Sequence, residues 1–187
     1  MANIIPLNFR VAKPEDAPKI QQLVQAAFRA EDSRADWTAD MELGRSFQYS
    51  VEEVLKTINN PDAAIIMASD ENGVLLGSIG IIKCNDNLAR FAMLSVDPEQ
   101  QCGGIGRRVL AYAEDFARNW NLRTFGLNAL SSREKLIAWY ERCGYKKSGE
   151  TSPFPVDQLP QLNLPKDLCF VELEKDTLAE ELVVRRS

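Results

Sequence analysis

The sequence of 187 residues contains no histidine. This absence excludes serine–histidine and cysteine–histidine nucleophile pairs, histidine metal sites and histidine general bases together. The cysteines form no C-x-x-C pair, so neither a disulfide framework nor a four-cysteine zinc site is expected. We therefore expect no metal. The four cysteines are Cys84, Cys102, Cys143 and Cys169.

Long apolar stretches and an excess of positive charge are also missing. No segment approaches the roughly 20 apolar residues needed to cross a bilayer, and Met1 to Phe9 lack the apolar run of a signal peptide. The chain has 22 Lys and Arg against 27 Asp and Glu, a net charge of −5. This balance argues against a nucleic-acid surface, which needs a basic patch. We expect a cytoplasmic protein that binds neither membrane nor nucleic acid.

What is present is an ordinary globular composition, with 45% hydrophobic residues. This length is enough for one sizeable core, and the sequence shows no internal repeat, low-complexity tract or Gly/Ser linker. We therefore expect a single domain over residues 1–187.

The spacing of apolar residues predicts an α/β fold in which strands and helices alternate. Ser50 and Glu53 form a helix-capping pattern, and Asn72-Gly73 between two apolar runs predicts a hairpin. The stretch 31–49 is polar and contains aromatic residues, and the proline-rich segment 151–165 is expected to be a loop between the last two strands. The order predicts a mixed sheet with helices on its faces. Strands are expected at 9–12, 63–68, 74–82, 91–96, 124–130, 145–150 and 168–174, and helices at 20–28, from 50, at 105–120 and at 133–142.

A glycine-rich loop between a strand and a helix carries the clearest chemical signal. Gly103, Gly104 and Gly106 allow close approach of a ligand to the backbone. The amides of such a loop at a helix N-terminus bind phosphate oxygens, and Arg107 and Arg108 add positive charge there. A plain chain reversal is the alternative interpretation. No Gly-Lys-Ser/Thr follows, so a Walker loop is excluded, and a dinucleotide-binding G-x-G-x-x-G lacks its third glycine.

The loop resembles the signature of the GNAT superfamily of acyl-CoA N-acyltransferases, Q/R-x-x-G-x-G/A, through Gln101, Gly104 and Gly106. A second segment, from Tyr140-Glu141 to Gly144-Tyr145, is similar to the family's Y-E-x-x-G-F/Y element. The order of elements matches the family over nearly the whole chain. The resemblance implies a central mixed, mostly antiparallel sheet flanked by helices.

The resemblance also implies acetyl-CoA as cosubstrate and direct transfer of its acetyl group to a primary amine of a small molecule or protein in a ternary complex. In this family two parallel strands, here 91–96 and 124–130, splay apart around the pantetheine arm. Backbone amides of the first strand polarise the thioester carbonyl, and the pyrophosphate lies on the glycine loop. The implied coenzyme-binding residues are Leu94, Ser95, Val96, Gln101, Cys102, Gly103, Gly104, Ile105, Gly106, Arg107, Arg108, Asn128 and Arg133.

The resemblance makes Tyr140 the general acid for the departing thiolate, since a phenol with a pKa of about 10 stays protonated at neutral pH. A core role for Tyr140 is the alternative. Arg133 stands where many members carry a cofactor-binding asparagine, and Asn128 either takes part of that role or is only structural. Arg90 stands where some members carry a glutamate base, and the base is unassigned.

Acidic residues between 31 and 42 and the aromatic residues Trp37, Phe47 and Tyr49 lie where this family builds its acceptor pocket. A solvated loop is the alternative for this charge cluster. The segment 151–165 is a candidate cap over the acceptor site or a plain connection. Three alternatives stay open: a non-catalytic acyl-CoA sensor or interaction module, a longer acyl donor, and a homodimer formed through edge strands.

Overall fold

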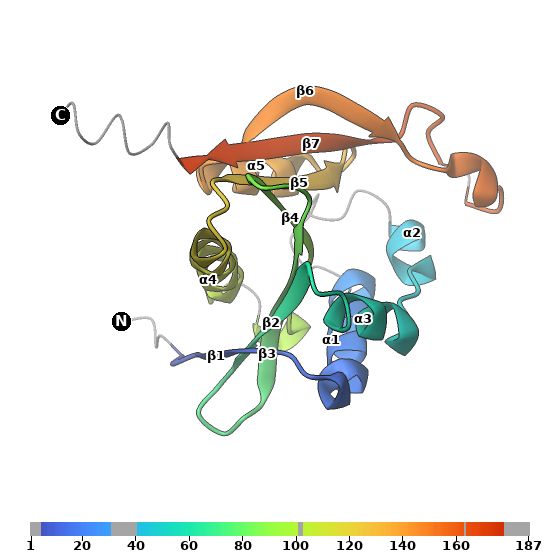
Figure 1. Ribbon diagram of the computed structural model, residues 1–187. Helices are drawn as coiled ribbons and strands as arrows, with labels where there is room; N and C mark the ends of the chain where they lie inside the picture. The colour runs from blue at the N-terminus through green and yellow to red at the C-terminus, as the bar shows by residue number, and fades with distance from the viewer. Residues whose placement is uncertain (1–4, 31–40, 101–102, 163, 178–187) are drawn as a thin grey trace.

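The computed structural model describes residues 5–30, 41–100, 103–162 and 164–177. One sheet has the strand order β1-β2-β3-β4-β5-β7-β6, shown in Figure 1. Neighbouring strands are antiparallel except β4 and β5, which are parallel. The predicted mixed, mostly antiparallel sheet is confirmed. The strands are β1 (Asn8–Val11), β2 (Ala63–Ser69), β3 (Leu75–Lys83), β4 (Leu88–Val96), β5 (Thr124–Leu130), β6 (Lys146–Pro153) and β7 (Cys169–Asp176).

Helices cover both faces of this sheet, with α1 and α3 on one side and α4 on the other (Figure 1). In the described ranges, no helix combines the length and apolar character needed to cross a bilayer. The helices are α1 (Ala17–Arg29), α2 (Met41–Ser46), α3 (Val51–Ile58), α4 (Ile105–Asn119) and α5 (Glu134–Arg142), with short 3-10 turns η1 (Pro14–Asp16), η2 (Pro98–Gln100) and η3 (Val156–Gln158).

The two faces hold two separate hydrophobic clusters, and strand β2 contributes to both by alternation. Ile66 and Ala68 pack into the cluster with α4 and α5, whereas Ile65 and Met67 pack into the cluster with α1 and α3. We call these the α4 face and the α1 face of the sheet. These four side chains of β2 are all buried, because the strand lies inside the sheet and is covered on both faces.

Two local predictions from the sequence are confirmed. The Ser50 hydroxyl accepts a hydrogen bond from the Glu53 amide at 3.2 Å, and the Glu53 carboxylate accepts one from the Ser50 amide at 2.8 Å. The β2–β3 hairpin turns at Gly73, whose φ of +81° is the left-handed conformation that glycine allows. Its loop spans five residues, and the Asp70 carboxylate accepts from the Val74 amide at 2.8 Å.

Other boundaries differ from the prediction. Helix α2 lies within the polar stretch 31–49, where the sequence predicted no helix because six residues are too few to show a helical period. Strand β6 continues through Thr151 to Pro153, residues expected in a loop. The sequence of β6 is polar and lacks alternation, since this edge strand is mostly exposed and is held by backbone pairing to β7. The expected acidic residues at 31–40 lie outside the described residues.

A buried carboxylate fixes the start of α1 against the first strand. Asp16 accepts two hydrogen bonds from the Arg10 guanidinium, both at 2.7 Å, and one from the Lys13 amide at 2.8 Å. The hydrogen bond from Arg10 is the main cause that lowers the pKa of Asp16 from 3.8 to about 2. The ionised form therefore stabilises the folded state.

Replacing Asp16 with asparagine should lower the free energy of unfolding at pH 7 by about 1–2 kcal/mol. Because the folded pKa of Asp16 lies below its ordinary value, its contribution is complete above about pH 5 and is lost as the pH falls toward 2. Urea unfolding of wild type and Asp16→Asn at pH 7, 5 and 3 should show the two curves converging. Asp86→Asn, at an exposed carboxylate 3.2 Å from Lys83, is the control. A difference between wild type and Asp16→Asn that does not change with pH would contradict this role.

Helix α4 packs directly on β3 at Gly77. A Cβ atom there would lie 2.9 Å from Val109 Cγ2 and 3.3 Å from the Ser95 carbonyl oxygen. We expect Gly77→Ala to lower the free energy of unfolding by about 1–3 kcal/mol through overpacking. In Gly126→Ala the nearest atom, Leu88 Cδ1, lies at an ordinary 3.5 Å, so this control should keep wild-type stability in urea denaturation. Equal stability of the two variants would refute the tight packing.

Candidate active site

The parallel strands β4 and β5 separate soon after they meet. They pair at Leu88–Thr124, Ala89–Phe125 and Arg90–Gly126. Within these two fully described strands pairing stops there, although β4 continues beside β3 and β5 continues beside β7. The predicted splay is therefore confirmed. The facing backbone edges of the two strands border a gap in the middle of the sheet.

Strand β4 is irregular where the gap opens. The register between β3 and β4 shifts between Ser78 and Gly80, and Met93 has a positive φ of 53°. Such a conformation costs on the order of 1 kcal/mol in a non-glycine residue. The Ser95 hydroxyl donates to the Met93 carbonyl oxygen at 3.1 Å. The bulge inverts the alternation of β4, because Phe91 packs on the α4 face and Met93 on the α1 face.

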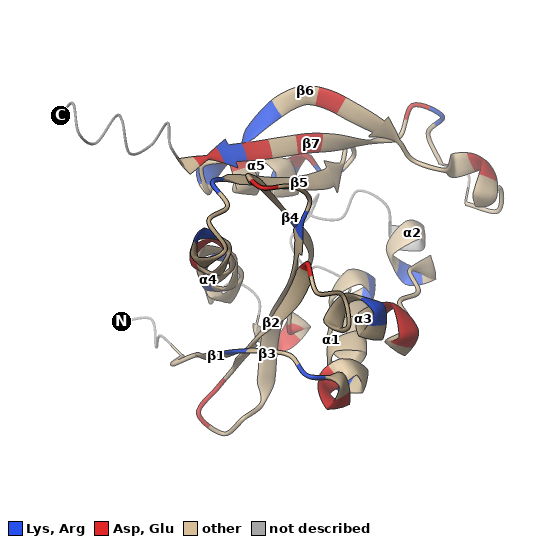
Figure 2. Cartoon of the chain, in the orientation of Figure 1, with Lys and Arg blue, Asp and Glu red and all other residues tan. Residues whose placement is uncertain are grey.

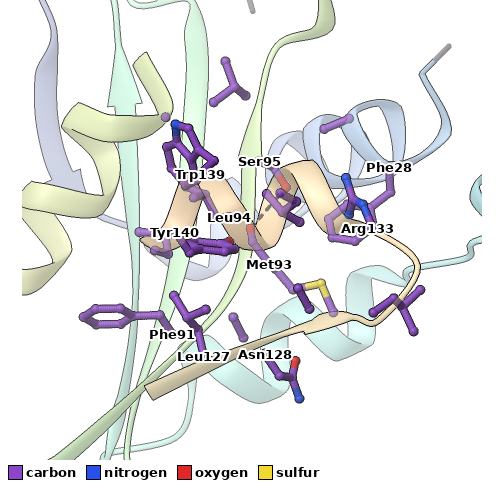
Figure 3. Close-up of a pocket in the computed structure, with 18 of the residues that line it drawn as sticks. Phe28, Phe91, Met93, Leu94, Ser95, Leu127, Asn128, Arg133, Trp139 and Tyr140 are labelled. Carbon is purple, nitrogen blue, oxygen red and sulfur yellow. Dashed lines mark hydrogen bonds between the residues drawn. The ribbon is translucent and has the colours of Figure 1, made fainter. Parts of the chain in front are cut away.

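A cavity of about 750 Å³ occupies the gap and is lined from both faces of the sheet. Figure 3 shows Tyr140, Leu94 and Met93 around this space. Leu94 belongs to the α4 face and Met93 to the α1 face, so the cavity passes through the sheet. The lining includes, from the α4 side, Leu94, Val96, Gly106, Trp139 and Tyr140 and, from the other side, Phe28, Phe47, Met93, Phe154 and Phe170.

The glycine loop lies at one end of the cavity. Gly104 lines it and caps α4 with a φ of +74°, without a side-chain cap. The first amides of a 15-residue helix thus lie beside the cavity, where they favour negative charge. A Cβ at Gly106 would meet Val96 Cγ2 at 3.5 Å and Trp139 at 3.8 Å, so any larger side chain there would compete with a ligand for space.

The two arginines that follow the loop point in different directions. Arg107 lines the cavity and donates to the Arg142 carbonyl oxygen at 3.1 Å. Arg108 donates to the Ile5 carbonyl oxygen at 2.6 Å. The structure therefore directs Arg108 toward the N-terminal segment, because residues one apart on a helix face different ways. The expected loop residues Gln101 and Cys102 lie outside the described residues.

The other predicted residues of the first strand and loop lie close together. Leu94, Ser95 and Val96 all line the cavity, as does the buried Ile105. Gly103 precedes the cap, and among the described residues a Cβ on it would come near the Gln100 carbonyl oxygen, at 3.6 Å. Apart from Gly103, these residues therefore line a single cavity.

Tyr140 lines the cavity from α5 and is only 7% exposed. Burial raises its pKa to about 12, so the phenol stays protonated and can donate a hydrogen bond at physiological pH. Its ring packs edge-on against Trp139, at 5.0 Å between centroids, and Tyr145, at 6.0 Å. Tyr145 is oriented elsewhere, since its hydroxyl donates to Glu114 at 2.9 Å. Of these two tyrosines, Tyr140 is the one that lines the cavity.

A polar cluster missed by the sequence analysis surrounds Glu172 of β7. Arg90 donates to one carboxylate oxygen of Glu172 at 2.8 Å, and Asn128 to the other at 3.2 Å. Ser152 approaches the same oxygen as Asn128, at 3.4 Å. The alternation of β7 signals which face Glu172 occupies, but its partners come from three other strands. A carboxylate thus lies beside Arg90, the residue that stands where some family members carry a glutamate base.

Two more predicted residues line the cavity, Asn128 from β5 and Arg133 from the start of α5. Arg133 is the N-cap residue of α5, and Figure 3 shows it near the end of that helix. The Asn128 amide is held by Glu172. Among the residues that the structure describes, no three His, Cys, Asp or Glu side chains gather where they could hold a metal ion.

The family model described as the acetyltransferase (GNAT) family matches residues 20–145. The chain is similar in structure to the ribosomal-protein-S18-alanine N-acetyltransferase from Escherichia coli, with 15% identity, a TM-score of 0.68, and coverage of 92% of this chain and 94% of that one. For the spermidine/spermine N-acetyltransferase SpeG from Vibrio cholerae the identity is 20%, the TM-score 0.66, and the coverage 97% and 96%.

A third structure, provisionally named a streptothricin acetyltransferase from Bacillus anthracis, was solved with acetyl coenzyme A. It shares 22% identity over 65% of this chain and 66% of that one, with a TM-score of 0.54. At these identities the structural matches establish the fold, and the family model spans well over half of the chain. The chain therefore belongs to the acetyltransferase (GNAT) family and is an acyltransferase.

Proposed function

We propose that this protein transfers the acetyl group of acetyl-CoA directly to a primary amine. The observation that supports this most is the cavity through the sheet, which brings the glycine loop and the Tyr140 ring to one space. The family uses acetyl-CoA, and one structural neighbour was solved with it. A cavity open to both faces allows a coenzyme and an acceptor to approach the same point from opposite sides.

The residues present fit such a coenzyme chemically. The unpaired edges of β4 and β5 can hydrogen-bond an extended arm that carries amide groups, as an added strand would. The amides of Gly103 to Arg107 and the Arg107 side chain suit phosphate oxygens. In our proposal Leu94, Ser95 and Val96 orient the thioester carbonyl, and Asn128 and Arg133 complete the wall. When bound, acetyl-CoA supplies an activated acetyl thioester.

In this proposal Tyr140 assists the departure of the coenzyme thiolate. The acceptor nitrogen bonds to the acetyl carbon, the carbon–sulfur bond breaks, and the amine loses one proton while the coenzyme thiol gains one. With a pKa of about 12, against about 8.5 for a thiol, Tyr140 keeps its proton more firmly than the thiol does. It therefore acts by donating a hydrogen bond that stabilises the developing thiolate. Its fixed position in the cavity wall makes that donation directional.

Substituting Gly106 by glutamate tests the coenzyme site. The new side chain would begin beside Val96 and Trp139 at the first turn of α4, where it would occupy space and its carboxylate would repel phosphate. We expect calorimetric titration of acetyl-CoA to show at least a 100-fold loss of affinity. Ala111→Glu introduces the same charge at an exposed position of the same helix and should bind normally. No binding by the folded wild type, or equal binding by Gly106→Glu, would overturn the proposed coenzyme site.

Replacing Tyr140 by phenylalanine should lower kcat by about 100-fold while acetyl-CoA affinity changes little. Thiol release with a panel of amines measures the rate. Tyr145→Phe is the matched control, because it removes a buried hydrogen bond to Glu114 outside the cavity and should reduce stability rather than turnover. Near-normal turnover by Tyr140→Phe would refute the role. Binding of acetyl-CoA without turnover by the wild type would favour the non-catalytic sensor.

A further inference from the structure

The end of the cavity on the α1 face is built from aromatic and other apolar side chains. They come from five separate parts of the chain: α1, the segment after α2, the bulge of β4, the segment after β6, and the start of β7. We call this end the aromatic vestibule, and it consists of Phe28, Phe47, Met93, Phe154 and Phe170.

Two pairs of rings, one stacked and one tilted, form its walls. Phe28 and Phe47 stack with centroids 4.4 Å apart and planes at 19°. The Arg29 guanidinium donates to the Phe47 carbonyl oxygen at 2.7 Å, which fixes this wall to α1. On the other side Phe154 and Phe170 pack at 5.5 Å and 56°. The two walls therefore come from structurally independent elements, as a binding site between them requires.

These four rings are only half-buried, and Phe28 and Phe47 lie at the margin of the buried cluster on the α1 face rather than inside it. Leaving several large rings partly in water around one cavity is costly unless a ligand covers them. An apolar body of the ligand would recover that free energy. The vestibule therefore points to an occupant with an aromatic or bulky apolar group.

The charged residues around the cavity limit the chemical class of the acceptor further. Among the described residues that line it, every charged side chain is an arginine: Arg90, Arg107, Arg133 and Arg142. Of these, Arg90 lies on β4 near the vestibule and is paired with Glu172. A second or third ammonium group on an acceptor would lie against apolar rings there, and the Glu172 carboxylate nearby is already paired with Arg90. This environment disfavours polyamines.

From these contacts we propose that the acceptor is a primary amine joined by a short alkyl spacer to an aromatic ring, which the vestibule binds. This inference rests on the proposed acetyl transfer. The ring would lie between the Phe28–Phe47 and Phe154–Phe170 walls, and the amine would point through the gap toward Tyr140. Offset and edge-on packing of three or more aromatic rings supplies both affinity and orientation.

Such a vestibule would also ease the removal of the acceptor proton. An alkylammonium with a pKa near 10.4 is only ~0.04% neutral at pH 7. Transfer from water to an apolar site disfavours the charged form, and each unit by which the pKa falls raises the neutral fraction about tenfold. Loss of the proton to water on entry would then reduce the need for a glutamate base at the position of Arg90.

The test compares kcat/KM for 2-phenylethylamine, ethanolamine and spermidine, with acetyl-CoA as donor. Burying one phenyl group predicts at least about a 30-fold preference for 2-phenylethylamine over ethanolamine. Phe154→Ala and Phe47→Ala, one from each wall, should each reduce this ratio about tenfold while acetyl-CoA affinity stays within twofold. Val74→Ala, an exposed apolar residue in the β2–β3 hairpin loop, is the control and should leave the ratio unchanged.

Failure of the inference and failure of the proposed function give different results. If acetyl-CoA binds but spermidine or ethanolamine is used as well as 2-phenylethylamine, or none is used, the aromatic acceptor is overturned. Faster transfer from octanoyl-CoA than from acetyl-CoA, abolished in the Phe154→Ala variant, would overturn it by assigning the vestibule to an acyl chain. If the folded protein does not bind acetyl-CoA at all, the proposed function itself fails.

Discussion

The site depends on the early parting of two parallel strands. After three paired positions, β4 and β5 turn away from each other while each keeps its other neighbour. Backbone amide and carbonyl groups in a protein interior need hydrogen-bond partners, so the separated edges must be met by water or by a ligand. The fold thereby places a row of backbone donors and acceptors inside the molecule. An extended ligand with amide groups is the natural partner for them.

The charge around the cavity differs in sign from the charge of the chain as a whole. The chain has a net charge of −5, and acidic residues recur along β7 (Figure 2). The charged side chains of the cavity lining that are described are nevertheless cationic. Overall composition therefore says little about a site built from a small part of the chain. An acidic protein can present a local positive potential where a polyanion is to bind.

Features set by local sequence could be predicted. The Ser50 cap, the Gly73 turn and the strand before the glycine loop each depend on neighbouring residues, and their patterns were visible in the sequence. The place of Tyr140 beside the loop followed from the resemblance to a family, because it depends on two motifs far apart in the chain.

Features set by tertiary contacts could not be predicted. Glu172 meets Arg90 only because three strands from distant parts of the sequence lie side by side. The positive φ of Met93 has no glycine to signal it, since a bulge imposes it. Strand β6 has no apolar alternation, and the contact between Phe154, just after β6, and Phe170 depends on the pairing of β6 with β7. A pattern confined to one segment carries no information on these pairings.

A buried carboxylate joins α4, the segment after α5 and β7 on one face of the sheet. Glu114 of α4 accepts from Tyr145, which follows α5, and at 3.0 Å from Lys175 of β7, and Lys175 also donates to the Cys143 carbonyl oxygen at 3.1 Å. Charge-assisted bonds of this kind, shielded from water, are expensive to break. The scaffold behind Tyr140 is thus joined by several buried polar contacts, whereas the half-buried Phe28–Phe47 wall is held to α1 by the hydrogen bond from Arg29 to the Phe47 carbonyl oxygen. Adjustment to acceptors of different size would fall on that wall and leave the position of the phenol unchanged.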